Sequence, residues 1–496
     1  AMTELKKYQM YIDGKYVNAE NDKTFESMNP ATGESWAIIP EASANDVDLA
    51  VKAAHRAFTS GPWSTMLPTG RGKLLRKLGD LLAKHSEELG EVETTDTGKL
   101  LKETRWQAGY ISEYYHYYAG LADKVQGATL PIDKPDMFAM TIREPLGVVA
   151  AIVPWNSQLF LTALKLGPAL ATGNTVVLKA SEHASAPMLA FAKVFEEAGF
   201  PPGVVNFITG FGDPCGQVLS SHPLVDRISF TGGLQAARHI IRNSAENFAQ
   251  VSTELGGKSP MIIFDDADMK SAINGILLSI FSASGQSCVA GSRLLIQDSI
   301  YDEVVAKIAE RAAEICIGDP LDEQTQMGPL ATRNQLDNIE RSVKLSLEMG
   351  AKLIYGARRP SGVNPKGLYY EPTIVECPNM DVHVAKTEMF GPVVSVLRFK
   401  DEEEAIAIAN DTNFGLASGI FTTNIGRGIR MSKAIRSGIV WINTYRAVSP
   451  MAPFGGFKDS GHGRESGLEA VYDYTREKTI WINTSSEPID DPFRMQ

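Results

Sequence analysis

The sequence predicts an α/β protein of several domains, because apolar, strand-like segments alternate with helical segments along much of its 496 residues. At roughly 150 residues per domain, this length favours about three domains. Hydrophobic residues make up 44% of the chain and charged residues 22%, which is typical of a globular protein rather than a disordered or fibrous one.

The first alternation runs from about residue 147 to residue 264. Helical segments such as Ser185–Ala198, which Gly199 is well placed to end, separate its strands. Strands joined through helices imply a parallel sheet covered on both faces, the architecture of a nucleotide-binding domain. The predicted strands are Gly147–Val153, Thr175–Lys179, Val204–Ile208, Arg227–Phe230 and Pro260–Phe264.

A second alternation follows residue 288 and predicts a second α/β domain. Two further segments, Ala128–Arg143 and Lys478–Asn483, alternate like exposed strands. Long strands with unpaired edges are usually covered or paired with another subunit, so we expect these segments to form an oligomerisation arm. The elements of the second domain are strands Ser292–Ile296, Val393–Phe399 and Gly438–Asn443, with helices Tyr301–Ala313 and Glu402–Asn410.

Charge and composition argue against several kinds of partner. Lys and Arg number 48 against 59 Asp and Glu, and a net charge of −11 gives no general attraction for nucleic acid or an anionic membrane. Apolar runs fall short of the roughly 18 residues that span a bilayer, and the first residues do not read as a signal peptide, so we expect a cytoplasmic protein. The four cysteines and eight histidines form no paired or metal-binding motif, so we expect reduced thiols and no protein-held metal.

Cys288 is the first candidate for chemistry. Small residues flank it in Gly285–Gly291, at a turn between the predicted helix Lys270–Ser282 and a strand. A thiol exposed at a helix end or beside a base can be activated as a thiolate nucleophile. An isolated cysteine is more often a buried structural residue, so this motif alone leaves both interpretations open.

Glu254 and Asn156 are the next candidates. Glu254 precedes a Gly-Gly turn that feeds a strand, where a desolvated carboxylate can serve as a general base. Asn156 follows the carboxyl end of the first strand, the sheet edge where ligands bind, and its amide could donate to a developing oxyanion. Considered singly, each also fits an ordinary surface or turn residue.

A pyrophosphate cradle is predicted at Phe230-Thr231-Gly232-Gly233 and the helical segment Leu234–Arg242 that follows, because backbone N–H groups at a helix start attract anions. A Gly-Gly turn alone is a weak signal. The segment Gly210–Gly216 looks like a dinucleotide fingerprint, but its glycine spacing is wrong and it contains a proline, so we expect a loop there.

Taken together, these motifs resemble the aldehyde dehydrogenase superfamily, in matching order and spacing over nearly the whole chain. The resemblance is to the NAD(P)-dependent, hydrolytic, non-acylating type. It implies a Rossmann-like cofactor domain (1–124 and 146–254), a second α/β catalytic domain (255–472) and a β-strand oligomerisation arm (125–145 and 473–496). The matching segments are 154–156, 178–182, 230–232, 254–258, 285–288, 388–393, 441–443 and 453–458.

The resemblance implies that the chain oxidises an aldehyde to the carboxylic acid with NAD as hydride acceptor. Cys288 matches the nucleophile that forms a thiohemiacetal, and Asn156 with the backbone N–H of Cys288 would hold the oxyanion. Glu254 matches the base that activates water to hydrolyse the resulting thioester. Lys165 and Glu465 match residues associated with a proton relay, with a structural ion pair as an equal alternative.

Cofactor residues carry over in the same way. Lys179 and Glu182 match the pair that binds the adenine ribose hydroxyls, and a carboxylate there repels a 2′-phosphate, so we expect NAD rather than NADP. Glu388 matches the ligand of the nicotinamide ribose, and Phe390 the aromatic residue beside the nicotinamide. The other expected cofactor residues are Trp155, Phe230, Gly232, Gly233 and Leu255.

The substrate mouth departs from the family pattern. Ser157 replaces a common bulky residue and Gln158 the usual proline, which places small and polar groups near the aldehyde. Arg446 is unusual, and we hypothesise that it receives a carboxylate or another polar acceptor, with a solvated surface arginine as the alternative. The expected lining residues are Tyr110, Tyr114, Ser157, Leu161, Leu164, Ser287, Val289, Arg446, Val448 and Phe454.

Two other readings compete with this one. A CoA-acylating semialdehyde dehydrogenase typically lacks the hydrolytic glutamate, whereas Glu254 is present. A non-catalytic protein of the same fold is disfavoured by the complete set of Cys288, Glu254 and Asn156. The aldehyde itself stays open among aliphatic, aromatic and semialdehyde substrates. The expected partners are that aldehyde and further copies of the chain, as a dimer or a dimer of dimers.

Overall fold

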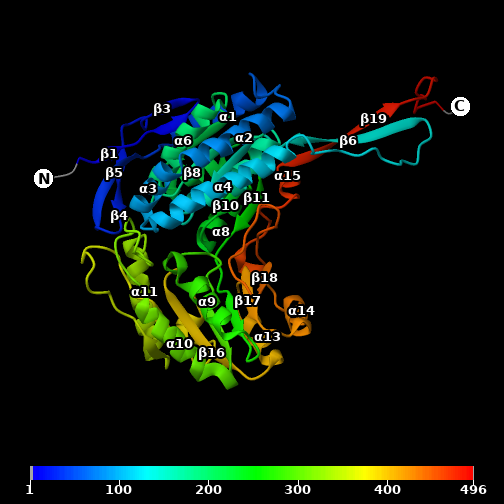
Figure 1. The fold of residues 1–496 in the computed structure, drawn as a ribbon. Coiled ribbons are helices and arrows are strands. Elements are labelled where there is room, and N and C mark those ends of the chain that lie inside the picture. Colours follow the sequence, from blue (N-terminus) through cyan, green and yellow to red (C-terminus); the bar gives the residue numbers. More distant parts are fainter. Residues whose placement is uncertain (1–3, 495–496) are drawn as a thin grey trace.

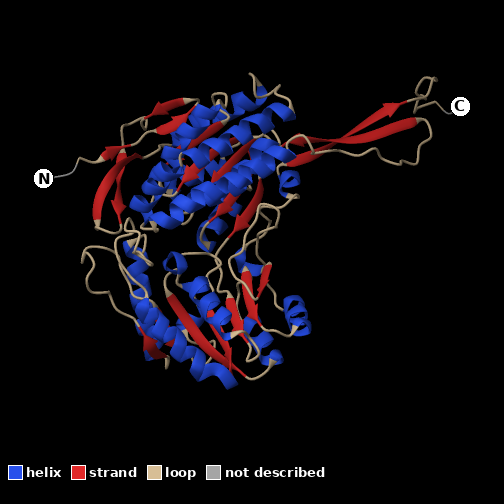
Figure 2. Ribbon diagram, in the orientation of Figure 1, coloured by secondary structure: helices blue, strands red, loops and turns tan. Residues whose placement is uncertain are grey.

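Two seven-stranded sheets with helices packed around them organise residues 4–494, the part of the chain that this computed structural model describes (Figures 1 and 2). The expected α/β fold is thereby confirmed. Residues 1–3 and 495–496, which begin and end the predicted domain ranges, lie outside the described residues. Among the helices of residues 4–494, none is long and apolar enough to cross a membrane.

The first sheet contains four of the five strands predicted for the first alternation, whereas the prediction for the fifth is wrong, because Pro260–Ile263 forms β12 of the second sheet. The strand order of the first sheet is β11-β10-β7-β8-β9-β2-β3, and the strands from β11 to β9 are parallel. Every residue of the central β7 is buried, as expected for a strand covered on both faces. The bounds are β2 (Met10–Ile12), β3 (Lys15–Val17), β7 (Val148–Ile152), β8 (Thr175–Ala180), β9 (Val205–Thr209), β10 (Val225–Thr231) and β11 (Gln250–Glu254).

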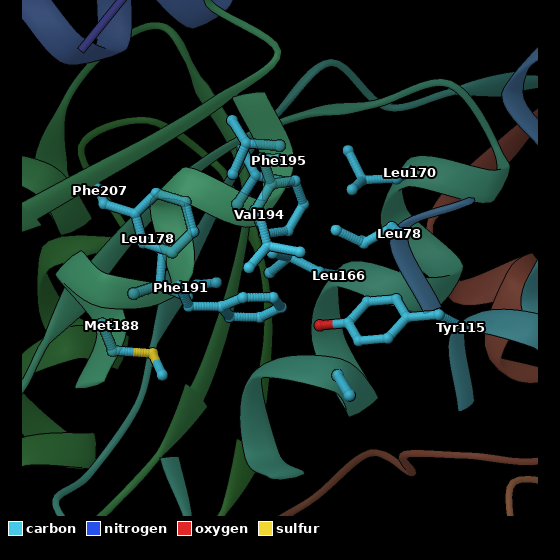
Figure 3. Packing of buried hydrophobic residues seen from close by; sticks show 14 of the residues in the cluster. Leu78, Tyr115, Leu166, Leu170, Leu178, Met188, Phe191, Val194, Phe195 and Phe207 are labelled. Atoms are coloured by element: carbon cyan, nitrogen blue, oxygen red, sulfur yellow. The ribbon is translucent and has the colours of Figure 1, made fainter. Parts of the chain in front are cut away.

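Aromatic side chains fix the helices onto this sheet. Phe191 and Phe195 of α6 lie against Phe207 of β9, with ring centroids 6.4 and 5.5 Å from it (Figure 3). Helix α6 ends at Gly199, whose φ of 93° is easily adopted by glycine, as predicted. The helices are α1 (Ala44–Thr59), α2 (Pro68–Lys84), α3 (Ser86–Thr97), α4 (Leu101–Leu121), α5 (Gln158–Ala171), α6 (Ala186–Ala198), α7 (Gln217–Ser221) and α8 (Leu234–Asn243).

The prediction of a loop at Gly210–Gly216 is wrong for most of that segment. Gly212–Gly216 forms a π-helical turn, kinked at Asp213 where the backbone is not helical, that runs directly into α7. The N–H of Gly216 donates to the carbonyl of Phe211 at 3.1 Å, and Cys215 is fully buried in the core beneath the sheet. Burial of this side chain holds the glycine-rich segment in a helical turn, which its composition alone does not indicate.

The strand order creates a crevice at the carboxyl ends of β7 and β10. The chain runs from β7 to β8 and β9 on one side, then crosses to β10 on the other side of β7. Such a reversal leaves a ligand-sized gap between the loops that follow the two central strands. Asn156 follows β7 and Gly232 follows β10, so both predicted ligand-binding segments meet at this crevice.

The second sheet has the order β14-β15-β16-β13-β12-β17-β18, with only β14 antiparallel. The strands and helices predicted for the second alternation are present in this second domain. The strands are β12 (Pro260–Ile263), β13 (Arg293–Gln297), β14 (Lys352–Tyr355), β15 (Thr373–Glu376), β16 (Val393–Phe399), β17 (Ala417–Phe421) and β18 (Ile439–Ile442). The helices are α9 (Met269–Ile280), α10 (Tyr301–Glu314), α11 (Arg333–Glu348), α12 (His383–Lys386), α13 (Glu402–Asn410) and α14 (Ile425–Ala434), with α15 (Ala470–Asp473) before the arm.

Strands β6 (Met137–Pro145) and β19 (Thr475–Asn483) form a two-stranded antiparallel ribbon that projects from the body (Figure 1). Lys478–Asn483 therefore forms a strand as predicted, whereas Ala128–Arg143 does so only from Met137 onward, and the role of the ribbon in oligomerisation stays a prediction. A small three-stranded sheet of β1 (Lys6–Lys7), β5 (Glu34–Pro40) and β4 (Thr24–Asn29) flanks the first domain. The exact domain bounds also remain predictions.

Candidate active site

The candidate site lies where the carboxyl ends of the first sheet face the amino ends of the second. Glu254 is the last residue of β11, and Cys288 lies just before β13. The two segments are in contact, because a side-chain carbon on Gly257 would lie 2.8 Å from the Cys288 carbonyl oxygen. The N–H of Leu255 donates to the carbonyl of Ser460 at 2.9 Å, which ties the end of the first sheet to the second domain.

Cys288 is partly buried in a turn that follows α9. Burial raises the pKa of its thiol to about 12, and the carboxylates of Glu388 and Glu254 add to that rise. The Arg446 guanidinium and the backbone N–H of Cys288 oppose the rise. The thiol is therefore protonated at neutral pH, so that attack on a carbonyl requires a base to take its proton.

Asn156 lies at the crevice beyond β7, as predicted. Its amide makes no hydrogen bond within residues 4–494, so its N–H groups are available to a ligand. It lines a cavity of about 20 Å³ together with Lys99, Ser157 and Gln286. Gln286 lies two residues before Cys288 in the chain, and the cavity has room for about one water-sized group.

Glu254 carries a carboxylate that is buried and has no hydrogen-bond partner among the described residues. Burial raises the pKa of this carboxyl well above its usual range, and Glu465 raises it further. Lys165 acts in the opposite direction and pairs with Glu465, with Nζ 2.6 Å from Oε1. Ser229 Oγ accepts a second hydrogen bond from Lys165 Nζ at 3.0 Å. A carboxyl group with a raised pKa can accept and release a proton at working pH, as a general base must.

The adenosine end of the predicted cofactor site lies at the carboxyl end of β8. Lys179 is buried, and its Nζ lies 3.9 Å from Glu182 Oε2. Glu182 is half-buried, so its carboxylate can reach ribose hydroxyls outside the sheet edge. A negative charge at this place repels a 2′-phosphate, which favours a cofactor with free ribose hydroxyls.

The diphosphate and nicotinamide ends follow the same crevice. A side chain at Gly233 would meet nothing within 4 Å, so the start of α8 is open to an anion, and the buried Thr231 Oγ1 has no partner among residues 4–494.

The Gly257 N–H donates to Glu388 Oε2 at 2.7 Å, and burial raises the Glu388 pKa to about 7. Phe390 packs edge-on against Trp155 with ring centroids 5.2 Å apart. The remaining expected cofactor residues, Phe230, Gly232 and Leu255, adjoin the ends of β10 and β11. The residues present therefore fit a dinucleotide.

Arg446 is half-buried beside the nucleophile rather than solvated at the surface. Its Nη2 donates to the Ser279 carbonyl at 2.9 Å, in the last turn of α9. Its Nε is buried and has no acceptor among residues 4–494. Burial lowers the pKa of Arg446 from its usual value, and the nearby Glu103 and Cys288 act in the opposite direction. A cationic group with a free, buried donor therefore adjoins the aldehyde site.

The other expected substrate residues differ in accessibility. Tyr110 is half-buried and donates to the Val448 carbonyl at 2.9 Å, which joins α4 to the segment after β18. Tyr114 is fully buried beneath it, with its ring edge-on to Tyr110. Leu161, Leu164, Val289 and Phe454 are buried, whereas Ser157 and Ser287 are partly accessible.

Lys99 is a residue of this site that was not predicted. Its Nζ donates to Ser157 Oγ at 2.8 Å, which places an ammonium group beside Asn156. The serine at position 157 indicated a polar pocket, but the sequence contained no sign of which side chain would reach it.

Several residues around the same place have strained backbone conformations. Non-glycine residues with φ between 53° and 61° include Ser157, Ala283, Ser284, Phe390 and Arg446. Such conformations cost free energy and persist where the surrounding structure imposes them, which is common at active sites.

Comparison with known proteins agrees with this geometry. A model of the aldehyde dehydrogenase family matches residues 16–480. The chain is also 57% identical over 493 residues to a (Z)-2-((N-methylformamido)methylene)-5-hydroxybutyrolactone dehydrogenase of Acinetobacter baylyi, covering 99% of this chain and 100% of the relative. The chain belongs to the aldehyde dehydrogenase family.

Solved structures of the family show the same fold. A betaine aldehyde dehydrogenase from Staphylococcus aureus in complex with NAD+ is 39% identical, with a TM-score of 0.95 over 97% of this chain and 96% of that one. A variant of an aldehyde dehydrogenase from Bacillus cereus is 41% identical, with a TM-score of 0.94 over 97% of each chain. The predicted fold and the enzyme class, an aldehyde dehydrogenase, are therefore confirmed.

Proposed function

We propose that this aldehyde dehydrogenase oxidises, with NAD, an aldehyde that also carries a carboxylate, and that Arg446 binds the carboxylate. The observation that supports this most is the buried Arg446 Nε, which has no acceptor within residues 4–494. Leaving a buried donor unpaired costs about 1–3 kcal/mol, and a carboxylate recovers that cost through charge-assisted hydrogen bonds.

The chemistry of the Acinetobacter relative's substrate supports the same class. Its name describes a 5-hydroxybutyrolactone. A 5-hydroxylactone is the ring-closed form of a molecule with an aldehyde at one end and a carboxylic acid at the other. Ring opening therefore exposes the aldehyde for oxidation and leaves a carboxylate for a cationic side chain.

In the proposed reaction, Cys288 Sγ attacks the aldehyde carbon while a solvent water molecule takes its proton. A carbon–sulfur bond replaces the carbonyl π bond and gives a thiohemiacetal oxyanion. The amide of Asn156 and the backbone N–H of Cys288 donate hydrogen bonds to this oxygen. NAD, when bound, accepts the hydride that leaves the former carbonyl carbon, and a thioester on Cys288 remains.

Glu254 then acts on the thioester. It takes a proton from a water molecule whose oxygen attacks the thioester carbon, and the carbon–sulfur bond breaks to release the carboxylic acid and the Cys288 thiolate, which takes a proton back from solvent water. The buried Lys165–Glu465 pair adjusts the pKa of Glu254 and is placed to pass its proton onward. The pair thus combines the two roles considered for it, ion pair and relay.

The cofactor residues follow from the crevice geometry. Lys179 and Glu182 would hold the adenine ribose, the open start of α8 at Gly233 the diphosphate, and Glu388 the nicotinamide ribose. Phe390 and Trp155 would enclose the nicotinamide. The carboxylate of Glu182 makes NAD the preferred cofactor over NADP.

Assembly and location complete the proposal. The ribbon of β6 and β19 exposes apolar side chains at Phe138, Ile142 and Ile482 on one face, and we assign this face to contact with a second copy of the chain. Whether dimers associate further into tetramers depends on other surfaces. All four cysteines are free thiols, which suits a cytoplasmic enzyme.

The substrate class is tested with a matched pair of aldehydes, 4-oxobutanoate and pentanal. The wild-type enzyme should prefer 4-oxobutanoate in kcat/KM, and Arg446→Leu should reduce that preference by about tenfold or more. Arg341→Leu, an exposed arginine on α11, is the control and should retain the preference. An Arg446→Leu enzyme with an unchanged ratio would contradict the proposal.

A further inference from the structure

Lys99 brings a second positive charge to the aldehyde pocket. It lies between α3 and α4, and its Nζ donates to Gln107 Oε1 and to Ser157 Oγ, each at 2.8 Å. Both acceptors are neutral, and within residues 4–494 no carboxylate lies within ion-pair distance of this ammonium group. Glu103 is near enough for its pKa to be affected by both Lys99 and Arg446, but it contacts neither.

An ammonium group has three N–H donors, and the hydrogen bonds to Gln107 and Ser157 use only two of them. The third has no acceptor among the described residues. The Ser157 hydroxyl accepts from Lys99, which leaves its own proton free to donate. Two polar donors are therefore available beside Asn156, where the aldehyde oxygen is proposed to lie.

The cavity beside these donors is large enough for one small polar group. Lys99, Ser157 and Asn156 line the cavity of about 20 Å³, which has room for a water-sized group. A bulky side chain at position 157 would separate Lys99 from this cavity, whereas serine lets the ammonium group reach it. The Ser157 backbone is held at a φ of 53°, so the hydroxyl is presented by an imposed conformation.

We propose that Lys99, oriented by Ser157 and Gln107, is a specificity-determining residue that binds an oxygen acceptor carried by the substrate close to its aldehyde carbon. This deepens the proposed function, on which it rests for the placement of the aldehyde. Arg446 then binds the distant carboxylate, and Lys99 binds an ether, hydroxyl or carbonyl oxygen next to the reacting group. The substrate would carry polar groups at both positions.

A matched pair of aldehydes isolates this contact. Methoxyacetaldehyde and butanal have the same chain length and differ in one position, where an ether oxygen replaces a methylene group. The wild-type enzyme should prefer methoxyacetaldehyde in kcat/KM by about fivefold or more, because a hydrogen bond from a charged donor is worth that much. Lys99→Met should bring the ratio close to one, mainly through KM.

Two further variants keep the test decisive. Lys102→Met removes the same charge from α4 without touching Ser157, and it should leave the ratio unchanged. Ser157→Ala removes the anchor and should lower the ratio even if Lys99→Met fails to fold. Equal losses on both aldehydes, or a wild-type enzyme without preference, would overturn the proposal.

The test of Lys99 can fail independently of the test of the proposed substrate class. The 4-oxobutanoate and pentanal pair reports on Arg446, and the ether and alkane pair reports on Lys99. If Arg446→Leu loses the carboxylate preference while Lys99→Met leaves the ether preference intact, only the Lys99 proposal fails. If the carboxylate preference is absent from the wild type, the proposed substrate class fails instead.

Discussion

Lys165 Nζ lies 2.6 Å from Glu465 Oε1 inside the protein, and this buried pair acts on the nearby carboxyl group of Glu254. Glu465 raises the pKa of Glu254, and Lys165 lowers it. Because a general base works only when ionised, the balance between these two charges sets the pH at which thioester hydrolysis begins.

Removing either charge should shift the pH dependence of kcat in opposite directions. Glu465→Gln removes a negative neighbour, so the Glu254 pKa falls and the acidic limb of the kcat profile moves to lower pH. Lys165→Met removes a positive neighbour, so that limb moves to higher pH. Breaking the buried pair should also cost about 3–5 kcal/mol in the free energy of unfolding, measured by denaturant titration. Shifts in the same direction would contradict this account of the pair.

The reactivity of the Cys288 thiol should respond to its charged neighbours. Burial raises the Cys288 pKa to about 12, and the Glu388 carboxylate adds to that rise, so Glu388→Gln should let iodoacetamide alkylate Cys288 faster at a fixed pH near 8. Arg446→Leu removes a positive charge and should slow the reaction. Peptide mass spectrometry separates Cys288 from the exposed Cys316, which is the internal control. Equal rates in wild type and both variants would show that these charges do not control the thiol.

Cofactor preference should depend on Glu182. Glu182→Ser removes the negative charge that repels a 2′-phosphate, so the ratio of kcat/KM for NAD over NADP should fall by at least about tenfold. Glu197→Ser, on an exposed part of α6, is a matched control and should keep the wild-type ratio. A Glu182→Ser enzyme that still discriminates fully would move cofactor selection to another residue.

The projecting ribbon should be needed for assembly. Phe138 and Ile482 are paired across β6 and β19 on one face and are 40% and 44% exposed. A double Phe138→Asp and Ile482→Asp variant places charges on this face and should lower the molecular mass in sedimentation to that of a smaller species, because buried charges without partners are costly. Asn483→Asp, at the end of β19, is the control and should assemble normally. Unchanged mass in the double variant would exclude this face as the interface.

The sequence was sufficient to locate most of the buried parallel strands, because these are largely apolar runs bounded by turn residues. It missed β11, β15 and β17, whose short segments mix apolar residues with polar residues or glycine. It was insufficient for the N-terminal elements. Strand β2 has three residues, and α3 buries the polar Glu93, Thr94 and Asp96, which hides its helical periodicity. Asp96 is accommodated by a hydrogen bond from Trp36 Nε1 at 2.9 Å, a contact that local pattern does not reveal.

For the candidate site, too, some residues were identified from the sequence and others only from the structure. Cys288, Glu254 and Asn156 were found because the order and spacing of their motifs matched a family, although each was ambiguous alone. The contact between Lys99 and Ser157 spans 58 residues and depends on how α4 meets the β7 edge, so no local pattern predicted it. The raised pKa of Cys288 likewise arises from burial and from carboxylates that the fold brings together.

The central claim is that Cys288 forms the thioester and Glu254 hydrolyses it, and rapid-quench or stopped-flow measurement of NADH tests this most directly. With NAD and 4-oxobutanoate, Glu254→Gln should release about one equivalent of NADH per site in a burst and then nearly stop, with acyl mass found on Cys288. Cys288→Ala should give no burst while NAD binding, measured by calorimetry, stays near that of wild type. Continued turnover in Glu254→Gln, or a burst from Cys288→Ala, would contradict the account.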